Sequence, residues 1–305
     1  MTQDLPRQSP NVPNYRQDPP PRIKQDKCTA CGLCASVCLV MEKRNNKVVI
    51  TRPELCIRCG HCGSICPSNA IVGPSVEAKR LTDRARTVAP SAASLQFLLR
   101  SRRSVRRYKR KPISKKDMDK ILEAGRYTPT GTNTQGIEYI VITDPGKIAL
   151  LGEMAMPAVI RLFGMAVRVS KIPVLGDLML GEQAAENFQK IYTPALKAID
   201  EYTRRGDDRL FYHAPAIILV HGEKLDDMAF SCSAALFSCM LMADTLGIGC
   251  CLNGFLVLAA NREPKVKKWL GIPRNHKAHA AMTLGYANVK YNHLVKRNPV
   301  KVKYL

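Results

Sequence analysis

Cysteine is the residue type whose number and spacing most clearly indicate chemistry in this chain of 305 residues. Eight of the twelve cysteines form two runs with the same spacing, C-x2-C-x2-C-x3-C, and Pro67 follows the second run. In such runs the first three cysteines bind one 4Fe–4S cluster, while the fourth reaches across to the other cluster. We therefore assign to one cluster Cys28, Cys31, Cys34 and Cys66, and to the other Cys56, Cys59, Cys62 and Cys38.

Zinc binding and disulfide formation are the alternative uses of these cysteines. Zinc sites usually combine two C-x2-C pairs rather than two quadruplets that exchange their fourth ligand. Disulfides belong mainly to secreted proteins, whereas residues 1–24 are polar and proline-rich and contain no apolar segment of a signal peptide. No stretch of 18 uncharged apolar residues follows, so no transmembrane helix is expected. We therefore expect metal clusters in a cytoplasmic protein.

Residues 22–74 resemble the bacterial ferredoxins that bind two 4Fe–4S clusters. Within this region residues 47–51 predict a short strand, and the Asn45-Asn46 pair predicts the turn before it. The resemblance implies an N-terminal ferredoxin-like domain with two clusters. A flexible proline-rich segment, residues 1–21, precedes this domain, and a linker, residues 75–90, follows it.

The rest of the chain, residues 91–305, mixes predicted helices and strands. Ser91 and Ser114 have the positions of helix N-caps, the latter with Asp117 three residues on. Two apolar segments, residues 139–143 and 216–220, predict buried strands, and residues 229–246 predict a long buried helix. More helix than strand in this order indicates an α+β fold.

Four short motifs follow one another in this second region. The first is the basic run Arg102-Arg103-Ser104-Val105-Arg106, and the second, residues 129–135, contains Asn133 and Gln135. The third, residues 245–254, is rich in small residues and ends in Asn253-Gly254. The fourth is Leu284-Gly285-Tyr286, with Arg297 in a basic tail beyond it. The third motif lacks the G-x-G-x-x-G spacing of a dinucleotide-binding loop and follows a helix rather than a strand.

These motifs, in this order, resemble the nitroreductase family of FMN enzymes across roughly residues 95–305. The resemblance implies a mixed sheet flanked by helices, an FMN cofactor and a homodimer. In the family the basic run and a late arginine hold the flavin phosphate, the amide residues lie beside the flavin, and a glycine-rich turn runs beneath its ring. The FMN-binding residues implied here are Arg102, Arg103, Ser104, Arg106, Asn133, Gln135, Asn253, Gly254 and Arg297.

The charge of the chain allows a second interpretation of the basic run. The formal net charge is +22, and eight of residues 100–111 are Lys or Arg. Such a run is also typical of a solvated surface or of a redox sensor that binds nucleic acid. Aromatic residues make up only 6% of the chain and no nucleic-acid-binding module is recognisable, so no nucleic-acid partner is expected.

Other candidate residues have plainer interpretations. Cys232 and Cys239 lie seven residues apart on an apolar helix and are expected to pack in a core, and Cys250 and Cys251 have no cluster spacing. We expect His213 and His221 to flank a strand, and His276 and His279 to lie on a loop. The methionine-rich residues 154–181 predict a helix over the substrate pocket, a core helix or a helix on a membrane surface. No catalytic residue is assigned, because flavin chemistry requires no side-chain triad.

The resulting hypothesis is an iron–sulfur flavoprotein that passes electrons from two clusters to FMN and then to an electron-poor organic acceptor of the nitroaromatic type. Ene reduction and reductive dehalogenation are alternative reactions of the same cofactor. The strongly basic chain predicts an acidic ferredoxin or flavodoxin as electron donor, with NAD(P)H as the alternative.

Overall fold

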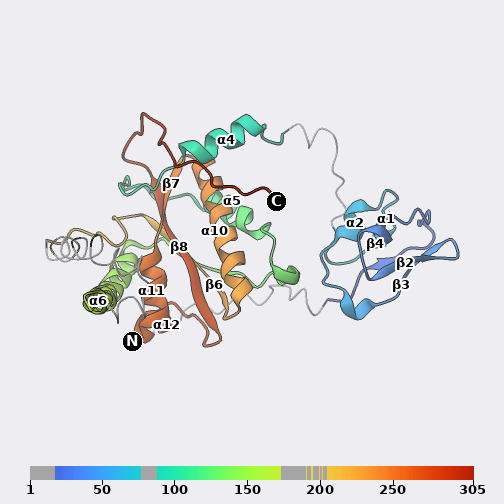
Figure 1. Cartoon of the computed structure of the whole chain (residues 1–305), viewed down its shortest axis with the longest axis horizontal. Coiled ribbons are helices and arrows are strands. Elements are labelled where there is room, and N and C mark those ends of the chain that lie inside the picture. Colours follow the sequence, from blue (N-terminus) through green and yellow to red (C-terminus); the bar gives the residue numbers. More distant parts are fainter. Residues whose placement is uncertain are drawn as a thin grey trace. The chain divides into compact units, whose positions relative to one another are not determined.

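A computed structural model describes residues 18–76, 88–172, 190, 194, 199, 201 and 205–305. The chain divides into two compact units, each described by itself (Figure 1). Unit 1 contains the described residues up to Ala89 together with the short segment Thr130–Gln135. Unit 2 contains Pro90–Pro129 and the described residues from Gly136 to Leu305. Most of the predicted N-terminal segment, most of the linker and residues 173–181 lie outside the described residues.

Unit 1 is small and is built from two antiparallel strand pairs, of which one is a hairpin, and two short helices. Its elements are β1 (Arg22–Ile23), α1 (Leu33–Ser36), β2 (Met41–Arg44), β3 (Lys47–Ile50), a 3-10 turn (Pro53–Leu55), α2 (His61–Ile65) and β4 (Ile71–Val72). Strands β1 and β4 pair antiparallel, as do β2 and β3. Asn45 and Asn46 join β2 to β3 with φ angles of 45° and 56°, which confirms the predicted turn.

The two cysteine runs fold in the same way, as expected for an internal repeat. A glycine with a left-handed backbone precedes each short helix, Gly32 before α1 and Gly60 before α2. Each helix then carries the third cysteine of its run, Cys34 or Cys62, and both side chains are buried. Because glycine adopts this backbone conformation without strain, it allows the chain to turn sharply next to the cysteines.

Unit 2 is organised around a four-stranded sheet. Its strands are β5 (Glu138–Ile142), β6 (Ala216–Glu223), β7 (Ile248–Leu252) and β8 (His276–Tyr286), in the order β5-β6-β8-β7. All three neighbouring pairs are antiparallel, and a single parallel bridge joins Ser104 to Cys250 of β7. Apart from this bridge, the strands that the structure describes pair only antiparallel, which is consistent with the α+β class.

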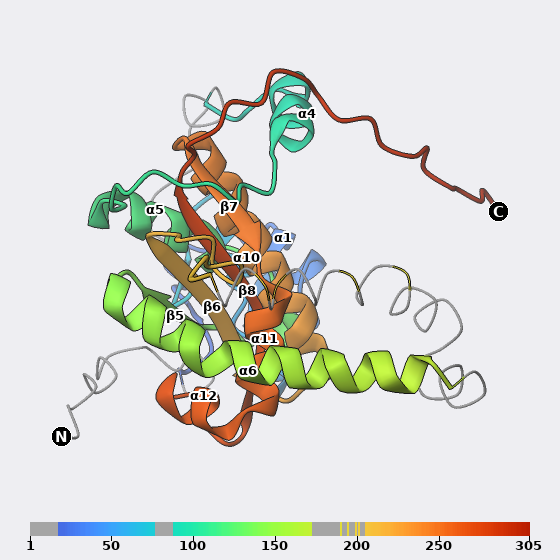
Figure 2. The ribbon, with the colours of Figure 1, turned by 90° about the vertical axis from the view of Figure 1, so that its left-hand side faces the viewer.

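Helices cover both faces of this sheet. One face packs against α6 (Pro145–Ser170), α11 (Gly254–Arg262) and α12 (Pro264–Trp269), and Figure 2 shows α6 in front of the strands. The other face packs against α5 (Lys115–Arg126) and α10 (Asp226–Thr245). Strand β6 sends Ile217 and Leu219 into the first core and Ile218 and Val220 into the second. Burial on both faces explains why its sequence is continuously apolar.

Local signals set the helix starts, as the sequence predicts. The Ser91 hydroxyl accepts the Ser94 amide at the start of α4 (Ala92–Ser101), and the Ser114 hydroxyl accepts the Asp117 amide at the start of α5. Three predictions are wrong. His221, expected to flank a strand, lies within β6. The glycine-rich segment expected as a turn forms strand β7, and the expected loop with His276 and His279 is the first part of β8.

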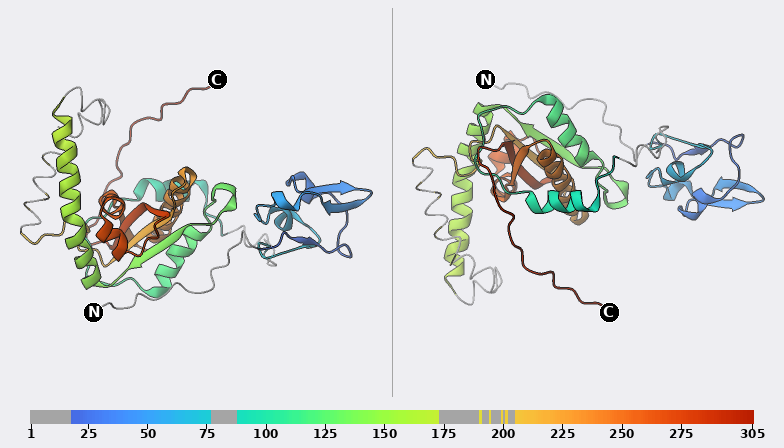
Figure 3. Two further views of the ribbon diagram at one scale, coloured as in Figure 1. Left: turned by 90° about the horizontal axis from the view of Figure 1, so that it is seen from below. Right: turned by 90° about the horizontal axis from the view of Figure 1, so that it is seen from above.

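Two helices in the described part of the chain are long and apolar enough to cross a membrane, Pro145–Val169 and Asp227–Thr245. Both are core helices of unit 2. In α6 the buried residues Leu151, Ala155 and Val159 recur every four positions and face the sheet. The second half of α6 projects beyond the strands, as does the irregular C-terminal tail after β8 (Figure 3).

Candidate functional site

One cavity of unit 1 brings together cysteines from both runs. Its lining includes Cys28, Cys31, Cys34 and Cys66, with apolar side chains such as Ile23 around them. Burial raises the pKa of the Cys34 thiol, and the nearby thiols of Cys66 and Cys28 raise it further. The fourth cysteine of the second run therefore lies with the first three of the first run.

The second cavity has the reciprocal composition. Its lining includes Cys38 from the first run and Cys56, Cys59 and Cys62 from the second. Burial raises the pKa of Cys62 to about 11, and Cys38, Cys59 and Cys56 act in the same direction. Four converging thiols in an apolar setting are a ligand set for a soft metal centre, either zinc or an iron–sulfur cluster.

Hydrogen bonds to sulfur support this interpretation at Cys66. Its thiol is partly desolvated, yet hydrogen bonds from Ser68 and from the Ala70 amide outweigh that effect and lower its pKa. The Ala70 nitrogen lies 3.3 Å from the Cys66 Sγ. Amide donors aimed at ligand sulfurs are one means by which proteins stabilise and tune iron–sulfur clusters. The residues present thus fit thiolate-bound iron–sulfur groups.

In unit 2 the basic run lies alongside strand β7. The Val105 amide donates to the Cys250 carbonyl over 3.0 Å, next to the Ser104 bridge. Gly249 is required here because a Cβ at that position would lie 2.5 Å from the Val105 side chain. The first and third sequence motifs, about 145 residues apart, are therefore neighbours in the fold.

The fourth motif joins the same place. The Lys109 amide donates to the Tyr286 carbonyl, and Tyr108 forms a bridge with Ala287. The buried Tyr108 hydroxyl donates to the Val105 carbonyl over 2.6 Å and also contacts Thr283 of β8. Three of the four motifs thus meet at the β7–β8 edge of the sheet.

Arg103 has the arrangement expected of an anion-binding side chain. Its Nη1 donates to the carbonyls of Arg100 and Arg102, each over 2.7 Å. Its Nε and Nη2 atoms are buried and have no hydrogen-bond partner among the residues that the structure describes. An unpaired buried guanidinium is costly unless an anion pairs with it, and a phosphate matches its two free donors.

The neighbours of Arg103 add positive charge and a hydroxyl. Arg106 lies 5.9 Å from the centre of the Tyr212 ring, and Arg102 lies near the partly buried Asp244. Burial raises the pKa of Cys251, while hydrogen bonds from Ser104 and Arg106 act in the opposite direction. The residues predicted from the basic run therefore gather around β7 and fit the phosphate end of FMN.

Asn253 and Gly254, at the end of β7, have different roles in the fold. The Asn253 side chain is buried, accepts the Leu256 amide at 2.9 Å as the N-cap of α11, and donates to the Leu210 carbonyl at 2.6 Å. Gly254 begins α11 and lines an open cavity of about 500 Å³.

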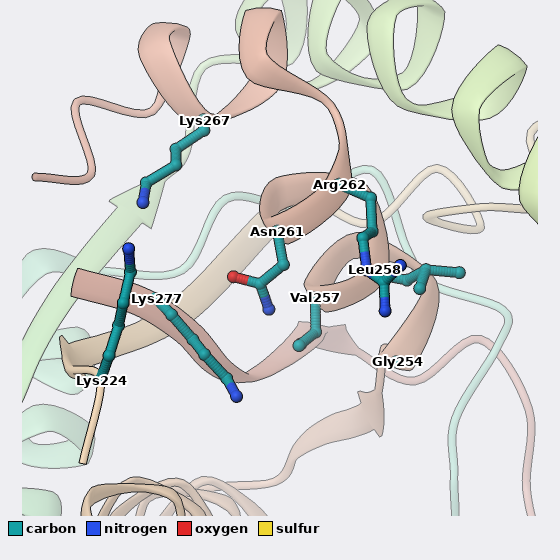
Figure 4. Close-up of a pocket in the computed structure, with 8 residues that line it drawn as sticks. All are labelled: Lys224, Gly254, Val257, Leu258, Asn261, Arg262, Lys267 and Lys277. Carbon is teal, nitrogen blue, oxygen red and sulfur yellow. The ribbon is translucent and has the colours of Figure 1, made fainter. Parts of the chain in front are cut away.

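This cavity is basic. Figure 4 shows Lys224, Lys267 and Lys277 around it, with Arg262 on α11. The amino groups of Lys224 and Lys267 point toward each other, and burial together with Lys224 lowers the pKa of Lys267. Its described lining contains no Asp or Glu, so the cavity favours an anionic or electron-rich occupant. The sequence does not reveal this cavity because its cations come from α11, α12, β8 and the residue just after β6, with no fixed spacing.

The second motif lies elsewhere, in unit 1. The Asn133 amide group donates to the carbonyls of Ile57 and Arg58, over 3.0 and 3.1 Å, beside the second cysteine run. Thr132, Asn133 and Gln135 all have positive φ angles, which gives this segment a distinctive local conformation. Their predicted contact with FMN stays a prediction. Arg297 lies in the exposed C-terminal tail, and its phosphate role likewise stays a prediction.

Comparison with known families agrees with this geometry. The sequence model of the nitroreductase family matches residues 99–286, and that of the 4Fe-4S binding domain matches residues 49–72. The first match spans the basic run and all four strands of unit 2, and the second spans the second cysteine run. No curated protein matches the chain.

Solved structures resemble unit 2. A nitroreductase with bound FMN from Desulfitobacterium hafniense is 21% identical with a TM-score of 0.50, covering 70% of this chain and 100% of its own. This likeness shows the same fold. A nitroreductase with bound FMN from Bacteroides fragilis is 25% identical, with a TM-score of 0.46 and coverage of 68% and 94%. A BluB-like flavoprotein from Clostridium difficile is 16% identical, with a TM-score of 0.49 and coverage of 68% and 99%.

Proposed function

This chain belongs to the nitroreductase family, as an FMN-dependent oxidoreductase with an iron–sulfur domain, and we propose that it transfers electrons from two 4Fe–4S clusters through FMN to an electron-poor organic acceptor. The acceptor class we propose is nitroaromatic. The domain limits are those predicted from the sequence, a ferredoxin-like domain over residues 22–74 and a flavin domain over residues 91–305.

The observation that carries the proposal is the exchange of the fourth cysteines between the two cavities of unit 1. Cys66 lies with the first run and Cys38 lies with the second. Two independent zinc sites do not require such an exchange, whereas a pair of cubane clusters in a repeated module commonly uses it. Clusters carry one electron at a time, and FMN, when bound, combines two of them for an organic acceptor.

In this proposal, residues of unit 2 bind FMN. The Nε and Nη2 atoms of Arg103, which are buried and have no partner among the described residues, support a phosphate position beside Cys250, with Arg102, Ser104 and Arg106 around it. Gly254 begins a helix four residues after Cys250, at most about 13 Å away along an extended chain. The amide at a helix N-terminus has no partner within its helix, so it is free to donate to a polar ring atom.

The basic cavity beside Gly254 supports an acceptor position at the ring end of the proposed FMN site. Its cations favour a substrate that is anionic or that gains negative charge on reduction, as a nitro group does. Asn253 contributes by fixing the start of α11 rather than by exposing a polar group. We also propose a homodimer in the cytoplasm and an acidic electron carrier or NAD(P)H as donor, by resemblance to the family and from the charge of +22.

Measuring iron, sulfide and FMN in protein purified without oxygen tests this proposal. We expect the iron and sulfide of two 4Fe–4S clusters and one FMN per chain, together with reduction of nitroaromatic compounds by a low-potential donor. Parallel assays with enones and halogenated aromatics distinguish the proposed acceptor class from the alternative reactions. Zinc in place of iron, or flavin that stays oxidised while the clusters are reduced, would contradict the proposed electron path.

A further inference from the structure

A second cluster of metal-ligand side chains lies within unit 2, away from the basic run. Glu138 of β5, His221 of β6 and His276 of β8 come from three adjoining strands of the sheet. Glu138 is paired with His221 across β5 and β6. His276 lies two residues along β8 from Ala278, the partner of His221, and alternate residues of a strand share a face. The three side chains therefore meet on one face of the sheet.

The fold makes a specific local adjustment at this point. The pairing of β6 with β8 shifts register between Val220 and His221, so that Val220 pairs with Ala280 and His221 with Ala278. A bulge of this kind redirects side chains and is common next to functional sites. The extra residue is His279 of β8, so the bulge turns Ala278 and His276 onto the face that His221 occupies.

The three side chains converge closely. The Nδ1 atoms of His221 and His276 are 3.1 Å apart. The carboxylate oxygens of Glu138 lie 3.7 Å from His221 Nε2 and 3.8 Å from His276 Nδ1. One ligand atom from each residue can be chosen so that all three lie within 4.8 Å of one another.

The distances from Glu138 to the two histidines suit a shared metal ion better than hydrogen bonds. A separation of 3.7–3.8 Å is too long for a hydrogen bond between a carboxylate and an imidazole. Two ligands that each lie about 2.0–2.2 Å from one zinc ion can be as much as about 4.2 Å apart. The Glu138 side chain is 44% exposed, so a small rotation is enough to adjust its position.

A plain pair of hydrogen-bonded histidines is the alternative. One imidazole would then donate to the other, and Glu138 would stay outside the pair. However, both rings are almost completely buried, and neither makes a further side-chain hydrogen bond within the described residues. Two buried imidazoles that face each other with a carboxylate beside them match the His2Glu ligand set of zinc sites that keep a fourth position open.

The surroundings hold the ligands in place. The Lys267 ammonium donates to the His276 carbonyl over 2.7 Å and so fixes the backbone of one ligand. The same lysine brings positive charge near the site, which makes the Glu138 carboxylate necessary for binding a cation.

We propose that Glu138, His221 and His276 bind a divalent transition-metal ion of the zinc type, with a fourth position open to water. This ion ties β5, β6 and β8 together at one end of the sheet. It is separate from the iron–sulfur groups of unit 1, and the proposal does not depend on the electron path proposed above.

Equilibrium dialysis of the untagged holoprotein against Zn²⁺, with zinc and iron measured by mass spectrometry, tests the site. We expect one zinc per chain in the wild-type protein and in two control variants, Glu153→Gln and His293→Asn, whose exposed side chains lie outside the cluster. Loss of a supporting residue around a metal site typically weakens binding 10–100-fold. The ligand variants Glu138→Gln, His221→Asn and His276→Asn are therefore expected to bind zinc at least about a hundredfold more weakly.

Folding of each variant is checked by its iron and FMN content, and Glu138→Gln is the safest variant because its side chain is half-exposed. A rise in melting temperature on adding Zn²⁺, present in the wild type and absent in Glu138→Gln, gives a second readout. Equal zinc binding by the wild type and a folded Glu138→Gln protein, or no zinc binding by the wild type, would overturn the proposal.

Discussion

The two units use cysteine in opposite ways. In unit 1 eight cysteines line two cavities, and Cys31 and Cys59 are exposed at their edges. In unit 2 all four cysteines are buried among apolar side chains. Burial raises the pKa of Cys232 to about 12 and that of Cys239 to about 11. Regular spacing in the sequence separates the two groups correctly, since only the cysteines of the repeated runs converge.

The two units also differ in how they bring the residues of their candidate sites together. Unit 1 collects its ligands from two short runs that repeat along the sequence. Unit 2 brings together Arg103, Cys250 and Tyr286 from three separate segments, the first more than a hundred residues before the other two, through strand pairing and backbone hydrogen bonds. The function of a repeated local motif can be predicted from its spacing in the sequence. For a site that is assembled by a sheet, the sequence predicts individual residues but not which of them come together.

Replacing the fourth cysteine of either run should give the largest effect. Cys66→Ala is expected to abolish the cluster of the first run, and Cys38→Ala that of the second, because each removes a ligand from the opposite cavity. Each variant should lose about half of the iron. Iron analysis and electron paramagnetic resonance of the reduced protein measure this, with Cys232→Ala as the control that keeps both clusters. Loss of the cluster of the mutated run itself would contradict the crossed assignment.

The rate of thiol alkylation should differ widely between the cysteines of unit 1 and those of unit 2. Only the thiolate reacts, and a pKa raised to about 12 leaves Cys232 protonated at pH 8. We expect native Cys232 to react with iodoacetamide about a thousandfold more slowly than a free thiol. Cys31 and Cys59 should react readily once a chelator has removed the iron. Mass spectrometry of the labelled peptides checks both, and rapid labelling of Cys232 in folded protein would contradict its core position.

Removing positive charge around β7 should weaken FMN binding next. Each charge-assisted hydrogen bond contributes about 1.5–3 kcal/mol, so Arg102→Gln with Arg106→Gln is expected to weaken FMN at least about a hundredfold. The single variant Arg103→Gln should have a comparable effect, because its two unpaired donors are buried. FMN content after gel filtration and fluorescence titration measure the change. Arg107→Gln, an exposed neighbour, is the matched control. Full flavin in the double variant would show that the phosphate binds elsewhere.

Much of the fold could be predicted because its signals are local. The Asn45-Asn46 turn, the caps Ser91 and Ser114 and the apolar segment of β6 each depend on a few adjacent residues. Resemblance to the family predicts a glycine-rich turn where the structure has strand β7. In the structure only glycine fits at position 249, because the Val105 side chain packs against it. Residues near Gly249 in the sequence do not reveal this contact.

The site could be predicted less completely, for the same physical reason. His276 is expected on a loop, yet it is the first residue of β8 and is paired there with Glu223 of β6, which is 53 residues earlier in the sequence. The basic cavity beside Gly254 is lined by cationic side chains from four separate segments of the chain. Arg103 was identified by resemblance, but its unpaired buried donors are a property of packing alone.

The smallest expected effect concerns the electron donor. It bears on which of the two units the donor binds. Residues 1–80 contain twelve basic and six acidic residues, a formal +6, and the other 225 residues hold +16. An acidic carrier is attracted to both, and the attraction is screened over roughly 8–10 Å at physiological salt. We therefore expect the second-order rate of reduction by an acidic ferredoxin or flavodoxin to fall about tenfold between low and high salt.

Neutralising charge in one unit at a time locates the entry point. If electrons enter through the clusters, Lys43→Gln with Lys47→Gln, on the exposed hairpin of unit 1, should reduce both the rate and its salt dependence. Lys224→Gln with Lys277→Gln, at the basic cavity of unit 2, removes the same charge and serves as the matched control. Stopped-flow reduction at several ionic strengths compares them, with an uncharged small reductant as reference. A larger effect of the unit 2 pair would instead place the carrier at the flavin domain, because complementary charge speeds encounter only where the partner docks.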